Sequence, residues 1–128
     1  LATRASIADV GRWRLRSPAS DLVSTADAAL LVIHPTLEGV AHARSQLDDL
    51  KQVCEQVSVV CVGDRPYGAA EVVDALEFDA VTVLPADRRG ATLLGSGGVS
   101  ERWVNRSPLM RSMRALSTHL FTQEPAAS

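Results

Sequence analysis

The sequence predicts an α/β protein in three layers, with a mostly parallel β-sheet covered by helices on both faces. Three observations lead to this fold class. Short apolar runs rich in β-branched residues recur along the chain, amphipathic helical patterns separate them, and no linker is long enough to divide the 128 residues. Apolar runs that alternate with helices form right-handed βαβ units, whose strands are parallel.

The predicted strands are continuous apolar runs bounded by Pro, Gly or Asp. Such runs are typical of strands that are buried on both faces of a parallel sheet. The three strongest runs are residues 28–34, 57–63 and 80–85. A weaker run, residues 5–11, is predicted to form a fourth strand of the same sheet.

Helical periodicity fills the segments between these runs. Residues 36–56 place apolar side chains on one helix face, with Thr36 as the expected N-cap. Shorter helices are predicted over residues 69–76 and 86–94, and residues 95–98 form a flexible loop. A last helix starts at Ser107, which can cap it, and Pro108, which suits its first position. Its expected core-facing side chains are Leu109, Met113, Leu116 and Leu120.

The bulk properties fit one globular unit. The chain is 46% hydrophobic and 22% charged, and its net charge of −2 gives no overall attraction to nucleic acid or membranes. No secretory signal or membrane-length apolar run is visible, so we expect a cytoplasmic protein. The two cysteines, Cys54 and Cys61, are expected to be reduced core residues.

We expect residues 1–122 to form a single α/β domain or the C-terminal part of one, and residues 123–128 to form a flexible tail. The first residue is Leu1 and not Met, so the protein is expected to continue further upstream.

Polar and turn residues follow each predicted strand. In open parallel sheets, ligands bind beyond the carboxyl ends of the strands. The four segments there are A-D-V-G-R, H-P-T-L-E-G, V-G-D-R and L-P-A-D-R-R-G-A. Each one alone could be an ordinary turn, but their order and spacing, closed by S-P-L-M-R-S, form a more specific set.

This ordered set resembles the C-terminal part of the MinD/ParA family of P-loop ATPases, and the resemblance covers nearly the whole chain. It implies a P-loop NTPase-like fold and a nucleotide-dependent positional switch in cell division, DNA partition, or secretion and pilus placement. The family includes degenerate members that position pilus machinery.

The resemblance also implies roles for individual residues. Asp9 would hold the Mg²⁺ shell through water, as a catalytic or switch residue, and Gly11 would let the next loop approach the phosphates. Asp64 and Arg65 would belong to the base-recognition loop, where the family often has Asn. Pro85 and Asp87 would flank the base. The alternatives remain open: a strand-ending turn at Asp9, a turn at Asp64, and a helix N-terminal acid at Asp87.

The segment that grips phosphates in this family is absent from the sequence. No glycine loop followed by Lys occurs, and the single lysine, Lys51, lies in a helical pattern. We therefore expect ATP and Mg²⁺ as cofactors only if an upstream segment supplies that loop, and no hydrolysis by these residues alone. The three histidines are too scattered to suggest a metal site.

The expected partners are a second copy of the chain, the upstream part of the protein, or another protein. DNA binding through the C-terminal arginines would be weak, because the chain is acidic overall. No amphipathic membrane anchor follows the last helix. Two other functions stay open: a non-catalytic ATPase-like module for binding and localisation, and an unrelated flavodoxin-like domain.

Overall fold

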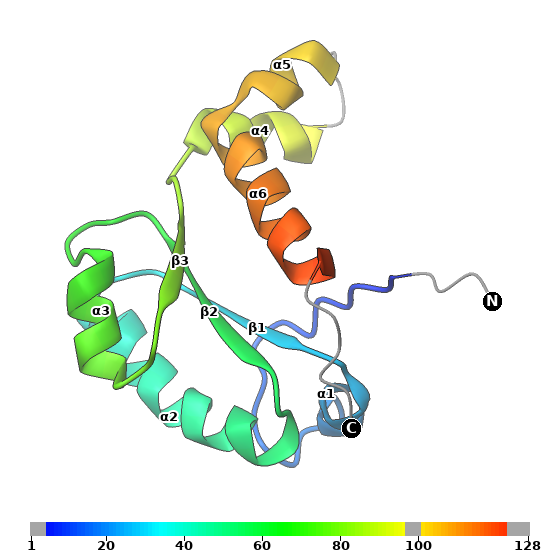
Figure 1. Cartoon of the computed structure of the whole chain (residues 1–128), viewed down its shortest axis with the longest axis vertical. Helices are drawn as coiled ribbons and strands as arrows, with labels where there is room; N and C mark the ends of the chain where they lie inside the picture. The colour runs from blue at the N-terminus through cyan, green and yellow to red at the C-terminus, as the bar shows by residue number, and fades with distance from the viewer. Residues whose placement is uncertain (1–4, 97–100, 123–128) are drawn as a thin grey trace.

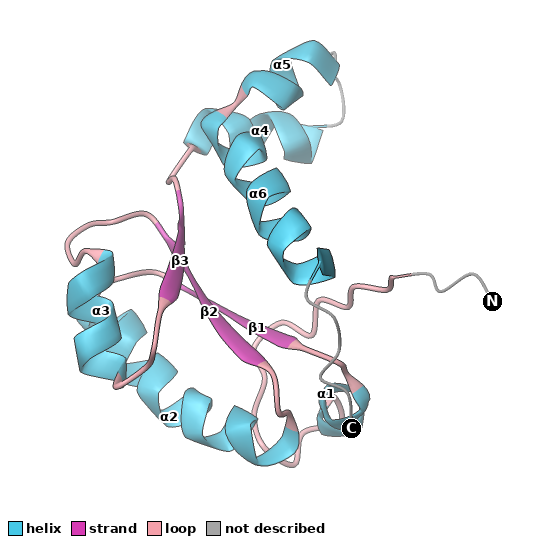
Figure 2. Ribbon diagram, in the orientation of Figure 1, coloured by secondary structure: helices cyan, strands magenta, loops and turns pink. Residues whose placement is uncertain are grey.

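The computed structural model describes residues 5–96 and 101–122, as six helices and three strands (Figures 1 and 2). The strands are β1 (Ala29–Ile33), β2 (Val57–Val62) and β3 (Val81–Leu84). The helices are α1 (Ser20–Thr25), α2 (Leu37–Val53), α3 (Ala69–Leu76), α4 (Arg88–Ser96), α5 (Glu101–Arg106) and α6 (Pro108–Thr122).

The three strands form one parallel sheet in the order β1-β2-β3. Leu31 pairs with Val59, and Val59 pairs with Val81, so these three side chains point to the same face. The three strong apolar runs are therefore confirmed as adjacent parallel strands, and the α/β class with them. All three are short and flanked by helices or turns, as the alternating pattern predicts.

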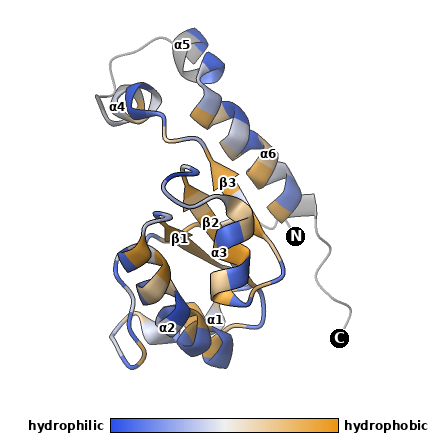
Figure 3. Ribbon diagram, turned by 90° about the vertical axis from the view of Figure 1, so that its left-hand side faces the viewer, coloured by the Kyte–Doolittle hydropathy of each residue, from blue (hydrophilic) through white to orange (hydrophobic). Residues whose placement is uncertain are grey.

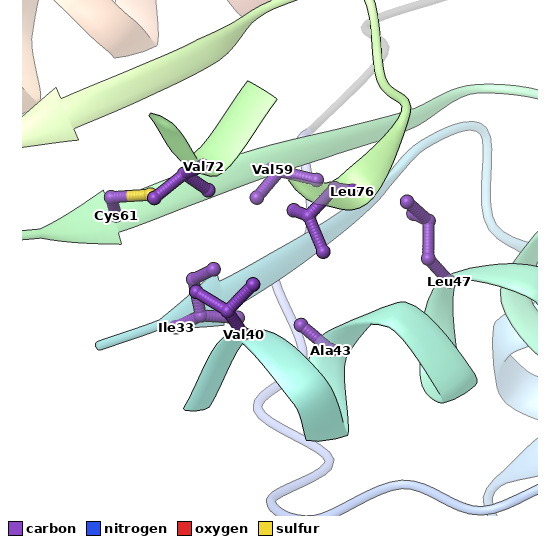
Figure 4. Close-up of a cluster of buried hydrophobic side chains, with 8 residues drawn as sticks. All are labelled: Ile33, Val40, Ala43, Leu47, Val59, Cys61, Val72 and Leu76. Carbon is purple, nitrogen blue, oxygen red and sulfur yellow. The ribbon is translucent and has the colours of Figure 1, made fainter. Parts of the chain in front are cut away.

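The main hydrophobic core lies between one face of this sheet and the helices α2 and α3 (Figure 4). Leu47, Val59 and Val72 are almost fully buried there, and each comes from a different element. The other members are Ile33, Val40, Ala43, Cys61 and Leu76. The apolar residues of α2 recur on one helix face because that face lies on the sheet.

The opposite face of the sheet is covered unevenly. Helix α6 contacts β3 and lies on the other side of the sheet from α2 and α3 (Figure 1). On β1, Leu30 and Val32 point to this face and are 41% and 59% exposed. The hydropathy colouring in Figure 3 shows the apolar strands beside helices of mixed character.

The predicted helix starts are confirmed in detail. The Thr36 side chain accepts a hydrogen bond from the Gly39 N–H (3.0 Å), which caps α2. The Ser107 side chain accepts one from the Met110 N–H (3.1 Å) at the start of α6. Helix α3 has the predicted bounds, and α4 begins two residues later than predicted.

Three expectations about packing and secondary structure were wrong. Residues 5–11 form no strand: the segment pairs with none of the three strands of the described sheet, and Ile7 is 88% exposed. Residues Gly95 and Ser96 belong to α4 and not to a loop, whereas residues 97–98 lie outside the described residues.

In α6, Leu116 is only half-buried and Met113 is 42% exposed, because that helix packs on one edge of the sheet. The predicted tail, residues 123–128, also lies outside the described part of the chain.

Candidate functional site

The loops that follow the three strands meet at one edge of the sheet, because the strands are parallel. Two backbone hydrogen bonds tie these loops together. The Gly63 N–H, after β2, donates to the Leu84 carbonyl at the end of β3 (2.7 Å). The Tyr67 N–H donates to the Pro35 carbonyl after β1 (3.2 Å). This carboxyl edge is where open parallel sheets bind ligands.

The loop after β1 is built tightly. Pro35 is among the most buried residues, and the His34 side chain beside it is exposed. A Cβ atom on Gly39 would overlap the His34 carbonyl oxygen and lie 3.0 Å from the Thr36 hydroxyl. The first turn of α2 therefore approaches the end of β1 more closely than a side chain at position 39 would allow.

The loop after β2 carries two of the predicted site residues, Asp64 and Arg65, and both are exposed. Gly63 before them has φ of +90°, which a residue with a side chain rarely adopts, and its Cβ position lies 3.4 Å from the Ala86 Cβ. This conformation turns the chain sharply at the end of the strand. In the described structure, the Asp64 carboxylate makes no hydrogen bond and no ion pair.

The loop after β3 contains the half-buried Pro85 and Asp87. The Asp87 carboxylate accepts hydrogen bonds from the first turns of two helices. Its Oδ1 accepts from the Gly90 N–H (2.9 Å) in α4, and its Oδ2 accepts from the Leu109 N–H (3.4 Å) in α6. A carboxylate at a helix N-terminus is also favoured by the helix dipole. Asp87 is thus a helix cap in this structure, which is one of the two alternatives that the sequence leaves open.

Asp9 and Gly11 lie apart from that edge. Asp9 Oδ1 accepts from the Gly11 N–H (2.9 Å), and Gly11 has φ of +61°. Val10, between them, packs with Trp13 in a second apolar cluster. That cluster contains residues at the amino-terminal starts of β1 and β2, including Ala29 and Val57. The structure therefore brings Asp64, Arg65, Pro85 and Asp87 together at the carboxyl edge, and leaves Asp9 and Gly11 away from them.

Trp13 is a residue that sequence analysis did not select. It is 5% exposed and packs with Val23 and Leu50, and its carbonyl accepts a hydrogen bond from Gln46 Nε2 (3.0 Å). Trp13 therefore anchors the N-terminal segment to α2. Its indole N–H and the Ser17 hydroxyl are buried and have no hydrogen-bond partner among the described residues.

Two hollows on the described surface lie away from the predicted site residues. One, of about 300 Å³, is lined by residues between the ends of α2 and α3, among them Lys51, Glu77 and Phe78. The other, of about 250 Å³, lies between β3 and α6 and is lined by Thr82, Leu116 and His119 among others. Neither is lined by Asp64, Arg65 or Asp87. Within residues 5–96 and 101–122, no three His, Cys, Asp or Glu side chains are placed to share a metal ion.

Charge is distributed unevenly along the chain. Residues 85–122 contain six arginines and two acidic residues, whereas residues 1–84 contain seven basic and twelve acidic residues. All six arginines are exposed. Their side chains lie on the three C-terminal helices or at their ends: Arg88, Arg89, Arg102, Arg106, Arg111 and Arg114. The ion pair between Arg44 and Glu77 (3.2 Å) lies on the other part of the molecule, at α2 and the end of α3.

In the described part of the chain, no helix is both long and apolar enough to cross a membrane. No protein-family model, curated protein or solved structure matches this chain.

Proposed function

We propose that this chain is the C-terminal part of a MinD/ParA-like ATPase that acts as a nucleotide-dependent positional switch. One observation carries the proposal: the loops after β1, β2 and β3 are tied together at one edge of a parallel sheet, with Asp64 and Arg65 exposed in the middle. That edge is the expected place for a nucleotide in a P-loop NTPase-like fold. In this proposal, ATP and Mg²⁺ bind only when an upstream loop grips the phosphates.

The base end of the nucleotide would lie at this edge, near Asp64, Arg65 and Pro85. Asp9 lies near the amino-terminal end of β1, away from this edge. In the described arrangement it would therefore not contact the water shell of a Mg²⁺ ion bound there. Asp87 would contribute indirectly, because it holds the starts of α4 and α6 behind Pro85. ATP hydrolysis would therefore need groups other than the residues at this edge.

The partners in this proposal are a second copy of the chain or the upstream part of the same protein. Leu30 and Val32 are the supporting observation, since they expose apolar surface on β1, and the outer edge of β1 is unpaired within the described sheet. Unpaired edges and apolar patches commonly mark interfaces. Light scattering over a range of concentrations tests this: a monomer at high concentration would contradict self-association.

Hydrolysis and localisation test the proposed function. These 128 residues are expected not to hydrolyse ATP, because backbone amides and a Lys on the β- and γ-phosphates are missing. The full product of the gene, carrying a fluorescent tag in its own organism, is expected to concentrate at a pole, the septum or the nucleoid. The double variant Asp64→Ala, Arg65→Ala should lose that pattern. Uniform distribution of the unaltered protein would contradict the proposal.

The hydrolysis and localisation assays also test the two alternative functions, a non-catalytic binding module and a flavodoxin-like domain. A non-catalytic binding and localisation module would keep the localised pattern with no ATP turnover by the full product. A flavodoxin-like domain would bind flavin, which the absorbance of the purified protein reports directly.

A further inference from the structure

Helices α4 and α6 carry positive charge that no acidic side chain of their own balances. Together they contain four arginines and no Asp or Glu. The Asp87 carboxylate joins their first turns, because one of its oxygens accepts a hydrogen bond from each helix. Arg88 and Arg111 therefore come from neighbouring turns. Both are exposed, and neither forms an ion pair with the residues that the structure describes.

The hollow of about 300 Å³ between the ends of α2 and α3 has the opposite charge. Three carboxylates line it, those of Glu55, Glu77 and Asp79, against the single cation of Lys51. The Lys51 ammonium lies 5.1 Å from the centre of the Phe78 ring, so this hollow already accepts a cationic group over an aromatic face. The C-terminal ends of two helices also meet here, and helix dipoles favour cations at such ends.

The two charged surfaces lie at opposite ends of the sheet. Helices α4 and α6 begin beyond the end of β3, at the top of Figure 1, whereas Glu55 and Asp79 lie just before the starts of β2 and β3. The length of the parallel strands separates the two surfaces within one chain. Their attraction can therefore be satisfied only between two chains.

The charge of the remaining surface favours a second copy of the chain over a nucleic acid as the partner. Residues 29–84 contain three basic and nine acidic residues, and residues 85–122 contain six basic and two acidic residues. A duplex that extends past the basic helices would be repelled by the carboxylates of the acidic part. A second copy instead presents those carboxylates to the arginines.

We propose that copies of this chain associate head to tail, with Arg88 and Arg111 of one copy in contact with the acidic hollow of the next. A guanidinium can donate two parallel hydrogen bonds to a carboxylate and can stack on an aromatic ring. Because the contact joins two different surfaces, every added copy leaves one of each free, and the assembly grows into rings or open chains. This association goes beyond the proposed switch, and it needs no nucleotide.

The test mixes two variants whose defects are complementary. Arg88→Glu with Arg111→Glu reverses the basic surface and keeps the hollow, whereas Glu55→Arg with Asp79→Arg reverses the hollow and keeps the arginines. All proteins also carry Val32→Lys, because a charge on an edge strand prevents pairing between β1 strands.

Sedimentation velocity at low salt should show species larger than a dimer for the protein with Val32→Lys alone. Each charge-reversed variant by itself should associate at least about tenfold more weakly. An equimolar mixture of the two should form one-to-one dimers and nothing larger, since only one intact pair of surfaces remains.

Salt and a matched control separate this contact from general attraction. Raising the salt from about 0.01 M to about 1 M shortens the screening length from about 30 Å to about 3 Å, and should dissociate the assembly. Arg12→Glu with Arg14→Glu makes the same change in charge at exposed positions of the N-terminal segment and should leave association intact. Thermal melts should show every variant folded, because the substituted side chains are exposed.

Three results would overturn the proposal. The first is a protein that stays monomeric at low salt, and duplex DNA bound by that monomer would assign the arginines to nucleic acid instead. The second is a mixture of the two variants that forms no dimer. The third is an equal loss of association in the Arg12→Glu, Arg14→Glu control, which would show that net charge and not the basic helices drives association.

Discussion

The carboxylate of Asp87 accepts a hydrogen bond from the backbone N–H of Leu109, 22 residues further along the chain, at 3.4 Å. Its other oxygen accepts from the Gly90 N–H at 2.9 Å. One side chain after β3 thus caps α4 and α6 together and fixes where the C-terminal helices leave the sheet. A Cβ atom on Gly90 would overlap the Asp87 carboxylate, so only glycine leaves room for this arrangement.

Asp87→Ala should lower the free energy of unfolding by about 1–2 kcal/mol, because two helix N-termini lose their cap. Asp87→Asn keeps an acceptor and should lose less. Urea unfolding followed by circular dichroism measures both. The matched control is Asp64→Ala. It removes a carboxylate from the loop after β2 that makes no hydrogen bond or ion pair with the described residues. An equal loss in Asp64→Ala would show that the effect is one of charge and not of capping.

Gly39→Ala should be destabilising by roughly 1–3 kcal/mol, although alanine is normally the better helix former. The added methyl group would overlap the His34 carbonyl oxygen and force the start of α2 away from β1. Ala41→Gly, at an exposed position of the same helix, serves as the comparison and should show only the propensity loss of about 1 kcal/mol. Thermal melts of the two variants decide: a neutral or stabilising Gly39→Ala would contradict the close approach.

Leu47→Ala and Leu116→Ala should differ clearly. Leu47 is 2% exposed in the core between α2 and the sheet, and its truncation should remove about 2–5 kcal/mol of stability. Leu116 is half-buried against β3, so its loss should be about half as large. Equal effects in urea unfolding would mean that α6 is buried as deeply as α2.

Burial raises the pKa of the Cys61 thiol, which is 1% exposed in the main core. The folded chain therefore holds this thiol protonated at a pH where the unfolded chain ionises it. The stability from this group is fully present below pH 9.0, its ordinary value, and is lost as the pH rises toward the raised pKa. Cys61→Val should show a smaller decline in stability above pH 9.0 than the parent. Parallel curves for the two proteins would argue against the shift.

The C-terminal arginines should give weak, strongly salt-dependent binding to duplex DNA. Arg111→Glu should reduce the affinity and the salt dependence, since Arg111 is exposed on α6 within the basic part of the chain. Lys51→Glu changes the charge by the same amount on α2 and should have little effect. Fluorescence anisotropy at several salt concentrations measures this. An equal loss of DNA affinity in the two variants would indicate that net charge attracts the DNA and that the C-terminal helices form no defined binding surface.

The sequence by itself determined the elements whose signals are local. Continuous β-branched runs predicted β1, β2 and β3, and the parallel order followed from the helices between them. Thr36 and Ser107 marked the starts of α2 and α6 because a side-chain oxygen satisfies N–H groups within the next three residues. The placement of Asp64 and Arg65 at the carboxyl edge followed from the same alternation of strand and helix.

Only the tertiary structure decided the features that need a distant partner. Residues 5–11 have a strand-like composition, but a strand exists only where another strand supplies its hydrogen bonds, and here Val10 and Trp13 anchor the segment at the start of the sheet instead. Because Val10 and Trp13 hold this segment at the start of the sheet, Asp9 lies away from Asp64, which follows the end of β2. Asp87 lies where a base-flanking acid was expected, yet its carboxylate is used by Leu109, and no local pattern around Asp87 specifies a partner 22 residues away.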